Sequence, residues 1–406
     1  MSKKKVGLLG LGTVGSGVWQ LITSDHADNF GIEKILVENP QKEREVDADP
    51  DLITDSFDHL IEDFNLDIIV AVIGGIEPAA TFIQEALERG IDVVTANKKL
   101  MARRGEELLQ TALKHDARLL FEASVAGAVP IIENLSRTVK TDEVKQVAGI
   151  INGTSNFILS QLSHNEASFE EVLNRAQELG YAESDPRDDI TGYDAVYKLS
   201  LLASITRGSW LSWQNIHRQG ISDIEEIDHR AAKKLGLEFK LLALARSRPE
   251  GLELSVEPAL LPREHPLAHV DDAKNSVRIE TGAGGSLSFS GPGAGSLPTA
   301  SAILRDMLRL KNREASPAPD RILGEGTESS SENNGVLPRE EHRSRYYIRS
   351  SRAGIESLTD IEIVKSCEIA SGKIFITSAA TRKELAQALA DSDLKAEAVY
   401  PLRKEL

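Results

Sequence analysis

The densest group of chemically useful side chains lies between Gly180 and Leu199. Five carboxylates, one arginine and one lysine fall within sixteen residues, from Glu183 to Lys198. The segment after Thr191 has the pattern of a helix, on which Asp194 and Lys198 are one turn apart on the same face. On spacing alone, such a pair is more often a surface salt bridge than a functional pair. Its surroundings must decide between the two.

The residues that follow Lys198 favour chemistry. Leu199–Ile205 is an apolar run, which predicts a largely buried helix. Burial of a lysine is costly unless it is paired, and it lowers the lysine pKa toward the range in which protons exchange near neutral pH. During reduction of a carbonyl by hydride transfer, the oxygen gains negative charge that a positioned ammonium can stabilise and protonate. Lys198 is therefore a candidate proton donor.

A dinucleotide site is predicted near the N-terminus. Residues 10–15 read Gly-Leu-Gly-Thr-Val-Gly, directly after a predicted strand and at the start of a predicted helix. Gly10 permits the tight turn, Gly12 lets the backbone approach a pyrophosphate, and Gly15 allows close packing of helix and strand. The N–H groups of the first helical turn, at Thr13 and Val14, then face the anion. The alternative is a glycine-rich turn without a ligand.

Glu38, at the end of the second predicted strand, bears on the choice of dinucleotide. A carboxylate there accepts the ribose 2′-OH of NAD and repels the 2′-phosphate of NADP. Lys42 and Arg44 lie just beyond it and could offset that repulsion. The residues therefore leave NAD or NADP open, with a lean toward tolerating NAD.

Three further positions have polar groups where a ligand would bind. Lys98 follows a predicted parallel strand, at the sheet edge where open α/β sheets bind ligands, although a solvated loop lysine is the simpler interpretation. Thr154 or Ser155 is the expected cap of a helix, which is compatible with contact to a polar substrate. Residues 122–129 offer one carboxylate and several carbonyls, which could coordinate a hard monovalent cation or form an ordinary loop.

The elements that position these residues divide the chain into three parts. Short apolar runs alternate with amphipathic stretches over residues 1–137, which predicts an α/β domain with a doubly wound parallel sheet of Rossmann type. Residues 138–297 predict a second, α+β catalytic and dimerisation domain. A helix over Thr299–Leu310 is expected to pack back on the first domain, so that 298–312 belongs with it. The sequence thus places a cleft between two domains.

The last ninety or so residues differ in composition. Residues 313–344 are rich in Pro, Ser, Glu, Gly and Asn and predict a flexible linker. Residues 345–406 predict a small α+β domain, too short for a large core of its own. We expect this domain to pair with another copy or to dock on the body of the protein.

Composition excludes several classes of function. The chain has 406 residues, of which 41% are hydrophobic and 27% charged, as in a globular enzyme. A net charge of -16 opposes binding to nucleic acid or to anionic lipid. No apolar run is long enough to cross a membrane, and no signal peptide is apparent. With Cys367 as the single cysteine, expected to be a small buried residue, a cytoplasmic location is predicted.

Taken together, these motifs resemble those of the homoserine dehydrogenase family. The resemblance runs from Val6 to about Leu310. It includes the glycine turn, Thr-Ala-Asn-Lys at 95–98, Phe-Glu-Ala-Ser-Val-Ala-Gly at 121–127, Asn-Gly-Thr-Ser-Asn-Phe at 152–157, the block at 180–199, and Gly-Pro-Gly-Ala-Gly at 291–295. It implies reversible, NAD(P)H-dependent reduction of L-aspartate 4-semialdehyde to L-homoserine, the branch step toward threonine, methionine and isoleucine.

The resemblance also implies roles for individual residues. Lys198 is expected to be the acid/base lysine, paired with Asp194, with Lys98 close to the substrate or the nicotinamide. Substrate contacts are expected from Glu183, Asp189, Asp194, Thr154 and Tyr181. Cofactor contacts are expected from Gly10, Gly12, Thr13, Val14, Gly15, Glu38, Gly74, Lys98 and Gly293. A sodium ion is expected at Glu122 and at the carbonyls of Val125, Gly127 and Val129, and the enzyme is expected to be a homodimer or homotetramer.

The chain departs from the family pattern at two places. Many relatives have a basic residue where Glu38 stands, which argues against a preference for NADP alone. The tail resembles an ACT regulatory domain, but residues 350–361 are too few for its usual first helix and preceding loop. Regulation by threonine through that loop and a role in assembly alone are therefore both left open for the tail.

Two rival functions remain at this point. A regulator that senses nicotinamide nucleotides without catalysis would bind a dinucleotide and show no turnover. Another dehydrogenase of this architecture, of the aspartate-semialdehyde or saccharopine type, is the nearer rival. The first of these needs a nucleophilic cysteine, and Cys367 lies outside the predicted catalytic region.

Overall fold

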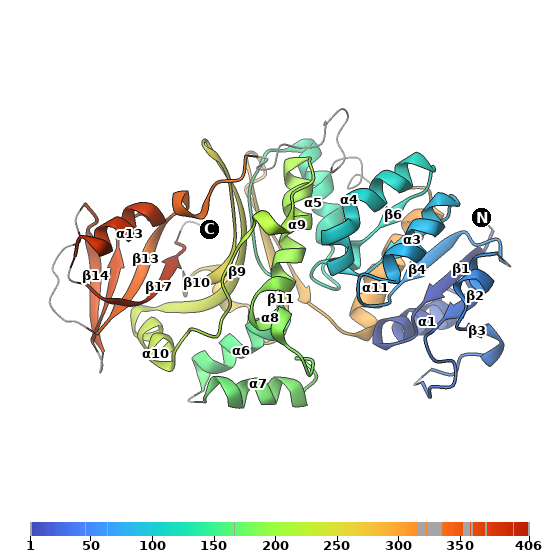
Figure 1. Ribbon diagram of the computed structural model, residues 1–406, viewed down its shortest axis with the longest axis horizontal. Coiled ribbons are helices and arrows are strands. Elements are labelled where there is room, and N and C mark those ends of the chain that lie inside the picture. Colours follow the sequence, from blue (N-terminus) through green and yellow to red (C-terminus); the bar gives the residue numbers. More distant parts are fainter. Residues whose placement is uncertain are drawn as a thin grey trace.

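The computed structural model is elongated, with three parts arranged in chain order (Figure 1). It describes residues 2–44, 46–62, 64–165, 167–314, 322, 335–351, 358, 360–369, 372–392 and 394–404. A parallel-sheet domain lies at one end, a mixed-sheet domain in the middle, and the C-terminal part at the other end. We call the described residues within 343–404 the tail.

The first domain is a parallel six-stranded sheet with the strand order β3-β2-β1-β4-β5-β6. The order reverses between β1 and β4: β1, β2 and β3 run to one side, and β4, β5 and β6 run to the other, as in dinucleotide-binding folds. Its central strands are continuous apolar runs, and every residue of β4 is buried, because helices cover both faces. The strands are β1 (Lys4–Leu9), β2 (Phe30–Leu36), β3 (Ile53–Thr54), β4 (Ile68–Ala71), β5 (Asp92–Thr95) and β6 (Leu119–Leu120).

The helices of this domain include one from much later in the chain. Helix α11 (Ser296–Lys311) packs against α1, so closely that a Cβ added at Gly17 would lie 2.8 Å from the backbone oxygen of Ser296. The Ser296 hydroxyl donates a hydrogen bond to the Thr13 carbonyl. Helix α11 thus lies against α1 in this structure. The other helices are α1 (Thr13–Asp25), α2 (Phe57–Glu62), α3 (Ala79–Glu88), α4 (Lys98–Lys114) and α5 (Ile131–Thr141).

The middle domain is built on long antiparallel strands in the order β12-β11-β7-β9-β10. Ten consecutive residues of β9 are buried, because the large core lies on one face and a smaller cluster that includes Leu267 lies on the other. The strands are β7 (Val144–Ile150), β8 (His217–Arg218), β9 (Leu237–Arg248), β10 (Gly251–Pro262), β11 (Lys274–Thr281) and β12 (Ser286–Pro292). The helices are α6 (Gly153–His164), α7 (Phe169–Glu178), α8 (Arg187–Ile190), α9 (Tyr193–Arg207) and α10 (Glu226–Leu235).

The tail continues the middle sheet. Its strands follow β10 in the order β17-β13-β15-β14, and β17 joins β10 in parallel at Leu402 and Leu260. Of the two alternatives for this region, docking on the body is the one observed. Its elements are β13 (Arg343–Ser350), β14 (Ile363–Ile369), β15 (Gly372–Thr377), β16 (Ala380–Thr381), α13 (Arg382–Ala390) and β17 (Ala396–Leu402).

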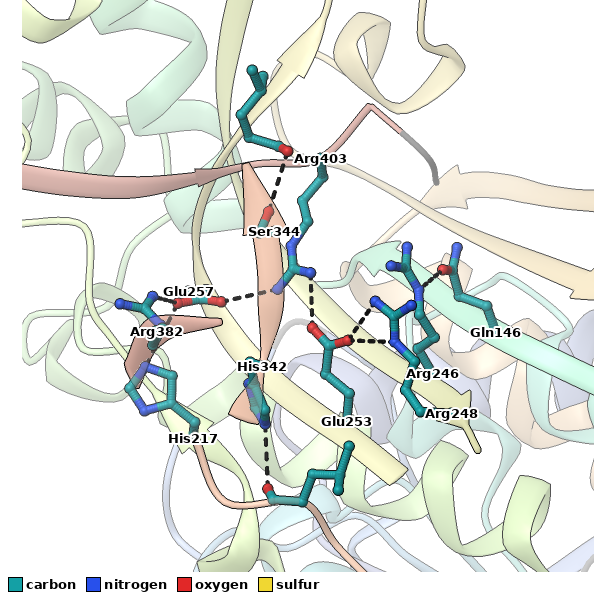
Figure 2. A network of polar contacts seen from close by, with 12 residues as sticks. Gln146, His217, Arg246, Arg248, Glu253, Glu257, His342, Ser344, Arg382 and Arg403 are labelled. Atoms are coloured by element: carbon teal, nitrogen blue, oxygen red, sulfur yellow. Dashed lines mark hydrogen bonds and ion pairs between the residues drawn. The ribbon is translucent and has the colours of Figure 1, made fainter. Parts of the chain in front are cut away.

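Two buried carboxylates of β10 hold the tail (Figure 2). Glu253 pairs with Arg403 at 2.7 Å and with Arg248 at 3.1 Å. Glu257 pairs with Arg403 at 3.3 Å and closely with Arg382 of α13. Burial by itself would raise the pKa of Glu257, but these arginines hold that pKa at about 2. The carboxylates are therefore ionised at neutral pH, and the tail is attached by charge pairs removed from water.

Several expectations need correction. The predicted linker 313–344 lies largely outside the described residues, but its described end, from Gly335, is bound to β10, where Leu337 N–H donates to the Leu252 carbonyl. Strand β13 begins at Arg343, two residues before the start that was predicted for the C-terminal domain. Cys367 is half-buried on β14 instead of fully buried.

None of the described helices is long and apolar enough to cross a membrane.

Candidate active site

A cleft of about 870 Å³ opens between the first two domains. One wall consists of loops at the carboxyl ends of parallel strands, where open α/β sheets bind ligands. The other wall is the polar segment of the middle domain that precedes and begins α9. The lining residues are Val14, Val72–Gly75, Ala96–Lys99, Glu183, Asp185, Arg187–Asp189, Thr191, Tyr193 and Asp194.

The glycine turn between β1 and α1 has the geometry of an anion site. Gly10 has φ +102°, which disfavours any residue with a Cβ, and a Cβ at Gly15 would lie 2.1 Å from the Gly10 carbonyl oxygen. A Cβ at Gly12 would meet no atom of the described chain within 4 Å, so the space in front of it is open. Gly12 also leaves the first turn of α1 without a side-chain cap. A dinucleotide pyrophosphate fits this space and these unpaired N–H groups.

Two lysines converge on one carboxylate at the floor of the cleft. Lys98 Nζ lies 2.7 Å from Asp194 Oδ1, and Lys198 Nζ lies 2.7 Å from Asp194 Oδ2. Lys98 comes from the first turn of α4, whereas Asp194 and Lys198 come from α9. The structure thus brings together the three residues that the sequence singled out from two domains.

Lys198 lies directly behind Asp194 and is not itself a lining residue of the cleft. Its side chain is 9% exposed, against 44% for Lys98. Its ammonium donates to Asp194 Oδ2 and, at 2.7 Å, to the Ile151 carbonyl. An ammonium has three N–H groups, so one donor of Lys198 remains for a substrate.

The electrostatics of the cluster give the two lysines different properties. The negative charge of Asp194 raises the pKa of Lys98, which therefore stays an ammonium at neutral pH. Burial lowers the pKa of Lys198, and Asp194 opposes that shift only in part. Burial alone would raise the pKa of Asp194, but the two ammonium groups hold it below its ordinary value. Lys198 is therefore the better proton exchanger of the two.

Asn152, which had no predicted role, connects two of the acidic side chains of the site. Its Nδ2 donates to Asp189 Oδ1 at 2.6 Å and to Asp194 Oδ2 at 2.8 Å. Its Oδ1 accepts the N–H of Ser155 at 2.7 Å and so caps α6. Thr154 and Ser155 were the expected caps, and this expectation is corrected. Burial and the charge of Asp194 raise the pKa of Asp189.

We expect Asn152→Ser to keep the helix cap and to lower kcat about tenfold. Serine is a good N-cap, but it lacks the amide that donates to both carboxylates. Steady-state kinetics and thermal unfolding separate the two effects. Ser168→Ala, which removes the cap of α7, is the matched control and should cost about 1 kcal/mol of stability without a change in kcat. An unchanged kcat in Asn152→Ser would show that the bridge is dispensable.

The remaining substrate-site predictions fall at the cleft or just behind it. Glu183 and Asp189 line the cleft. The Thr154 hydroxyl donates to the Tyr181 carbonyl at 2.6 Å, and the Tyr181 ring lies 5.0 Å from that of Phe157. Thr154 is thus buried behind the wall, while Tyr181 is 44% exposed at its edge.

The other cofactor positions are spread over the first domain and one distant loop. Gly74 lines the cleft, whereas Glu38 is exposed just after β2. Arg44 donates to the carbonyls of Asn39, Pro40 and Lys42, so its guanidinium is already engaged near Glu38. Gly293 lies against Gly127, at which a Cβ would come within 2.6 Å of the Gly293 carbonyl group.

The predicted cation loop is buried and partly satisfied. Each oxygen of the Glu122 carboxylate accepts an N–H at 2.8 Å, from Ile132 and Glu133 at the start of α5. Burial raises the pKa of Glu122. Within the described chain, the buried carbonyls of Val125 and Gly127 accept no hydrogen bond. These oxygens are the type of ligand that a hard monovalent cation takes.

Two family models match the chain. The model described as "Homoserine dehydrogenase, NAD binding domain" covers residues 10–122, and the one described as "Homoserine dehydrogenase" covers residues 130–308. They correspond to the two walls of the cleft. Together they span the residues discussed in this site except those at 123–129, which include Val125 and Gly127.

Similar proteins carry the same description. A homoserine dehydrogenase of Bacillus subtilis is 39% identical over 333 residues, which are 80% of this chain and 77% of that protein. The crystal structure of a homoserine dehydrogenase from Thiobacillus denitrificans has a TM-score of 0.88 and 33% identity, with 100% and 99% of the two chains covered. A hyperthermophilic archaeal homoserine dehydrogenase in complex with NADPH has a TM-score of 0.67 and 25% identity, over 77% of this chain and 99% of that one.

Proposed function

The chain belongs to the homoserine dehydrogenase family, and from that premise we propose how its cleft interconverts L-aspartate 4-semialdehyde and L-homoserine. Its activity is that of an oxidoreductase, with an NAD-binding domain that forms one wall of the site. The remaining question is which side chains hold the substrate and move the proton.

A nicotinamide dinucleotide, when bound, supplies or accepts the hydride. Gly12 and the first turn of α1 hold its pyrophosphate, because the turn has free N–H groups and open space in front of it. Gly74, Val14 and Lys98 line the same cleft and form the rest of the cofactor side. Gly293, in the loop between β12 and α11, is proposed to contact the cofactor from the side of the other domain.

Lys198 moves the proton. In the reduction direction its ammonium donates a proton to the substrate oxygen as negative charge develops there, and in the oxidation direction the neutral amine takes the proton back. Burial lowers the pKa of Lys198, which favours the neutral amine more than in an exposed lysine. Asp194 orients this ammonium and that of Lys98, whose fixed positive charge stabilises the developing oxyanion.

The acidic wall of the cleft binds the amino group of the substrate. Glu183 and Asp189 line the cleft within the same segment as Asp194, whose charge is already balanced by the two lysines. Of the other carboxylates in the lining, Asp185 pairs with Arg187 and Asp188 pairs with Lys99, so an α-ammonium is drawn to Glu183 and Asp189. Thr154 and Tyr181, which a hydrogen bond joins, are proposed to support this end of the pocket.

One observation carries the proposal: Asp194 holds two lysines of different domains at 2.7 Å, one exposed in the cleft and one buried behind it. The direct test follows the absorbance of the reduced nicotinamide with L-homoserine and each oxidised dinucleotide. We expect turnover that depends on both substrates. Dinucleotide binding without turnover would instead support the sensing regulator.

We expect the enzyme to work with NADH as well as with NADPH. Glu38 is exposed next to the expected ribose position, and Arg44 is held by three carbonyls of its own loop. A strong preference of the wild type for NADPH would contradict this use of Glu38, although the archaeal relative was solved with NADPH. Glu38→Gln should shift the ratio of kcat/KM values toward NADPH about tenfold, because it removes the charge that repels a 2′-phosphate.

A sodium ion fits the loop at residues 122–129. The Glu122 carboxylate would supply the charge, and the carbonyls of Val125, Gly127 and Val129 would complete the oxygen ligands. The carbonyls of Val125 and Gly127 are buried without hydrogen bonds in the described chain, which supports this assignment. The ion would stabilise the loop that packs against Gly293.

The tail is an ACT-like module in this proposal. Its antiparallel strand order β17-β13-β15-β14, with α13 between β15 and β17 in the chain, agrees with that type of fold. Most of the stretch in which the first helix of such a module would fall, 352–357, lies outside the described residues. We further propose a cytoplasmic enzyme that forms a homodimer or homotetramer.

A further inference from the structure

We propose that Arg218 is a positioning residue, which fixes the turn between Asp189 and Asp194 from a segment that the tail holds in place. The segment runs from His217 to Asp228, and we call it the strut. The inference rests on the proposed function, because it concerns the geometry of the two carboxylates at the cleft. It gives the tail a role in the active site that does not require an effector.

The first end of the strut binds the active-site turn, which runs from Asp189 to Asp194. The guanidinium of Arg218 donates to the Thr191 carbonyl and lies 3.9 Å from the centre of the Tyr193 ring. Both partners line the cleft. They also lie between Asp189 and Asp194 in the chain, so Arg218 sets the separation and orientation of these carboxylates.

The backbone of the strut touches the same turn. Ile221 N–H donates to the Ile190 carbonyl at 3.0 Å. A Cβ at Gly220 would lie 2.7 Å from that carbonyl oxygen, which shows how closely the two chains approach. The turn itself is tight, because Gly192 has φ +86°. The turn is thus held by backbone and side-chain contacts from one short segment.

The other end of the strut is held by the tail. Tyr347 O–H donates to Asp228 Oδ1 at 2.8 Å, and Arg349 Nε donates to the same oxygen at 3.0 Å. Tyr400 O–H donates to the Asp223 carbonyl at 3.0 Å. Asp228 is completely buried, so its position depends on these tail residues and on the cap that it makes at the start of α10.

The first end of the strut also pairs with the middle sheet. Strand β8 pairs with β10, with His217 opposite Ser255 and Arg218 opposite Val256. Neighbouring residues of a strand point to opposite faces, so His217 and Arg218 face different partners. Figure 2 shows His217 beside Glu257, which pairs with Arg382 of the tail. Arg218 instead donates a hydrogen bond to the Thr191 carbonyl of the turn.

A displaced tail would therefore act on the substrate side of the cleft. The strut would shift Arg218, and with it the carboxylates that bind the substrate ammonium. The glycine turn lies in the other domain, between β1 and α1. The expected signature is a higher KM for homoserine with an unchanged dinucleotide Kd.

Two adjacent buried tyrosines of β13 provide a matched test in the full-length enzyme. Tyr347→Phe removes the bond to Asp228, whereas Tyr346→Phe removes a bond to the His342 carbonyl that does not involve the strut. We expect Tyr347→Phe to raise the homoserine KM about threefold and Tyr346→Phe to leave it unchanged. Equal effects of the two variants would overturn the inference.

Arg218→Lys tests the other end. Lysine keeps the charge but loses the planar stacking and the reach of the guanidinium, so we expect the KM to rise about tenfold while the dinucleotide Kd stays within about twofold. In this background Tyr347→Phe should have no further effect, because both changes act through one contact. A normal KM, strictly additive effects, or a parallel loss of dinucleotide binding would overturn the inference. A wild-type enzyme without turnover on homoserine would instead refute the proposed function.

Discussion

Replacement of Lys198 by alanine is expected to lower kcat by about three orders of magnitude in both directions, because it removes the ammonium that is proposed to exchange the proton. The dinucleotide Kd should stay unchanged, since the glycine turn is in the other domain. In the oxidation direction, the wild-type kcat should rise with pH as Lys198 becomes neutral. That limb of the pH profile should be absent from the variant. Steady-state kinetics and fluorescence titration with the reduced dinucleotide measure these effects.

Two controls separate chemistry from packing. Lys198→Met fills most of the space that alanine would leave, so an equal loss of kcat identifies the ammonium as the cause. Lys240→Met removes another buried lysine, which donates to the Val270 carbonyl and pairs with Asp271 away from the cleft lining. It should lower stability and leave kcat nearly unchanged. A near-normal kcat in Lys198→Met, combined with a dead Lys98→Met, would assign the proton to the other lysine.

Gly12→Ala is expected to weaken dinucleotide binding at least about a hundredfold while the free enzyme unfolds at its normal temperature. In the free protein a Cβ at Gly12 meets nothing within 4 Å, and its φ of -88° suits any residue. The methyl group would instead occupy the space through which the pyrophosphate approaches the first turn of α1. Calorimetric titration and thermal unfolding test the two halves of this prediction.

Gly15→Ala is the comparison for this variant. Its Cβ would lie 2.1 Å from the Gly10 carbonyl oxygen, so strand and helix must separate and the fold itself should lose stability. Gly12→Ala is thus expected to weaken dinucleotide binding without a loss of stability, whereas Gly15→Ala is expected to lower stability. Normal dinucleotide affinity in Gly12→Ala would place the pyrophosphate elsewhere.

The sequence was sufficient for the features that depend on local pattern. The apolar runs of β1, β4 and β5 predicted a parallel sheet because both faces of these strands are covered. The glycine spacing predicted the turn before α1, and the spacing of Asp194 and Lys198 predicted a pair on one helical face. Each of these signals lies within a few residues of chain.

The features that the sequence did not predict depend on contacts between residues far apart in the chain. Asn152 reaches Asp189 and Asp194 across about forty residues, and no local motif marks an amide that bridges two acids. Arg218 was overlooked for the same reason, since its neighbours give no sign that it meets Tyr193. The end of the predicted linker has the composition of a loop, yet β10 offers free backbone groups that bind it at Leu337. Only the folded arrangement reveals such partners.

The most direct test of the central claim is a crystal structure of the full-length enzyme with L-homoserine and an oxidised dinucleotide. We expect the pyrophosphate at Gly12, the substrate ammonium between Glu183 and Asp189, and the substrate hydroxyl within hydrogen-bond distance of the Lys198 ammonium. A homoserine bound outside the cleft, or one whose hydroxyl lies beyond the reach of Lys198 while Asp194 keeps both lysines, would contradict the account.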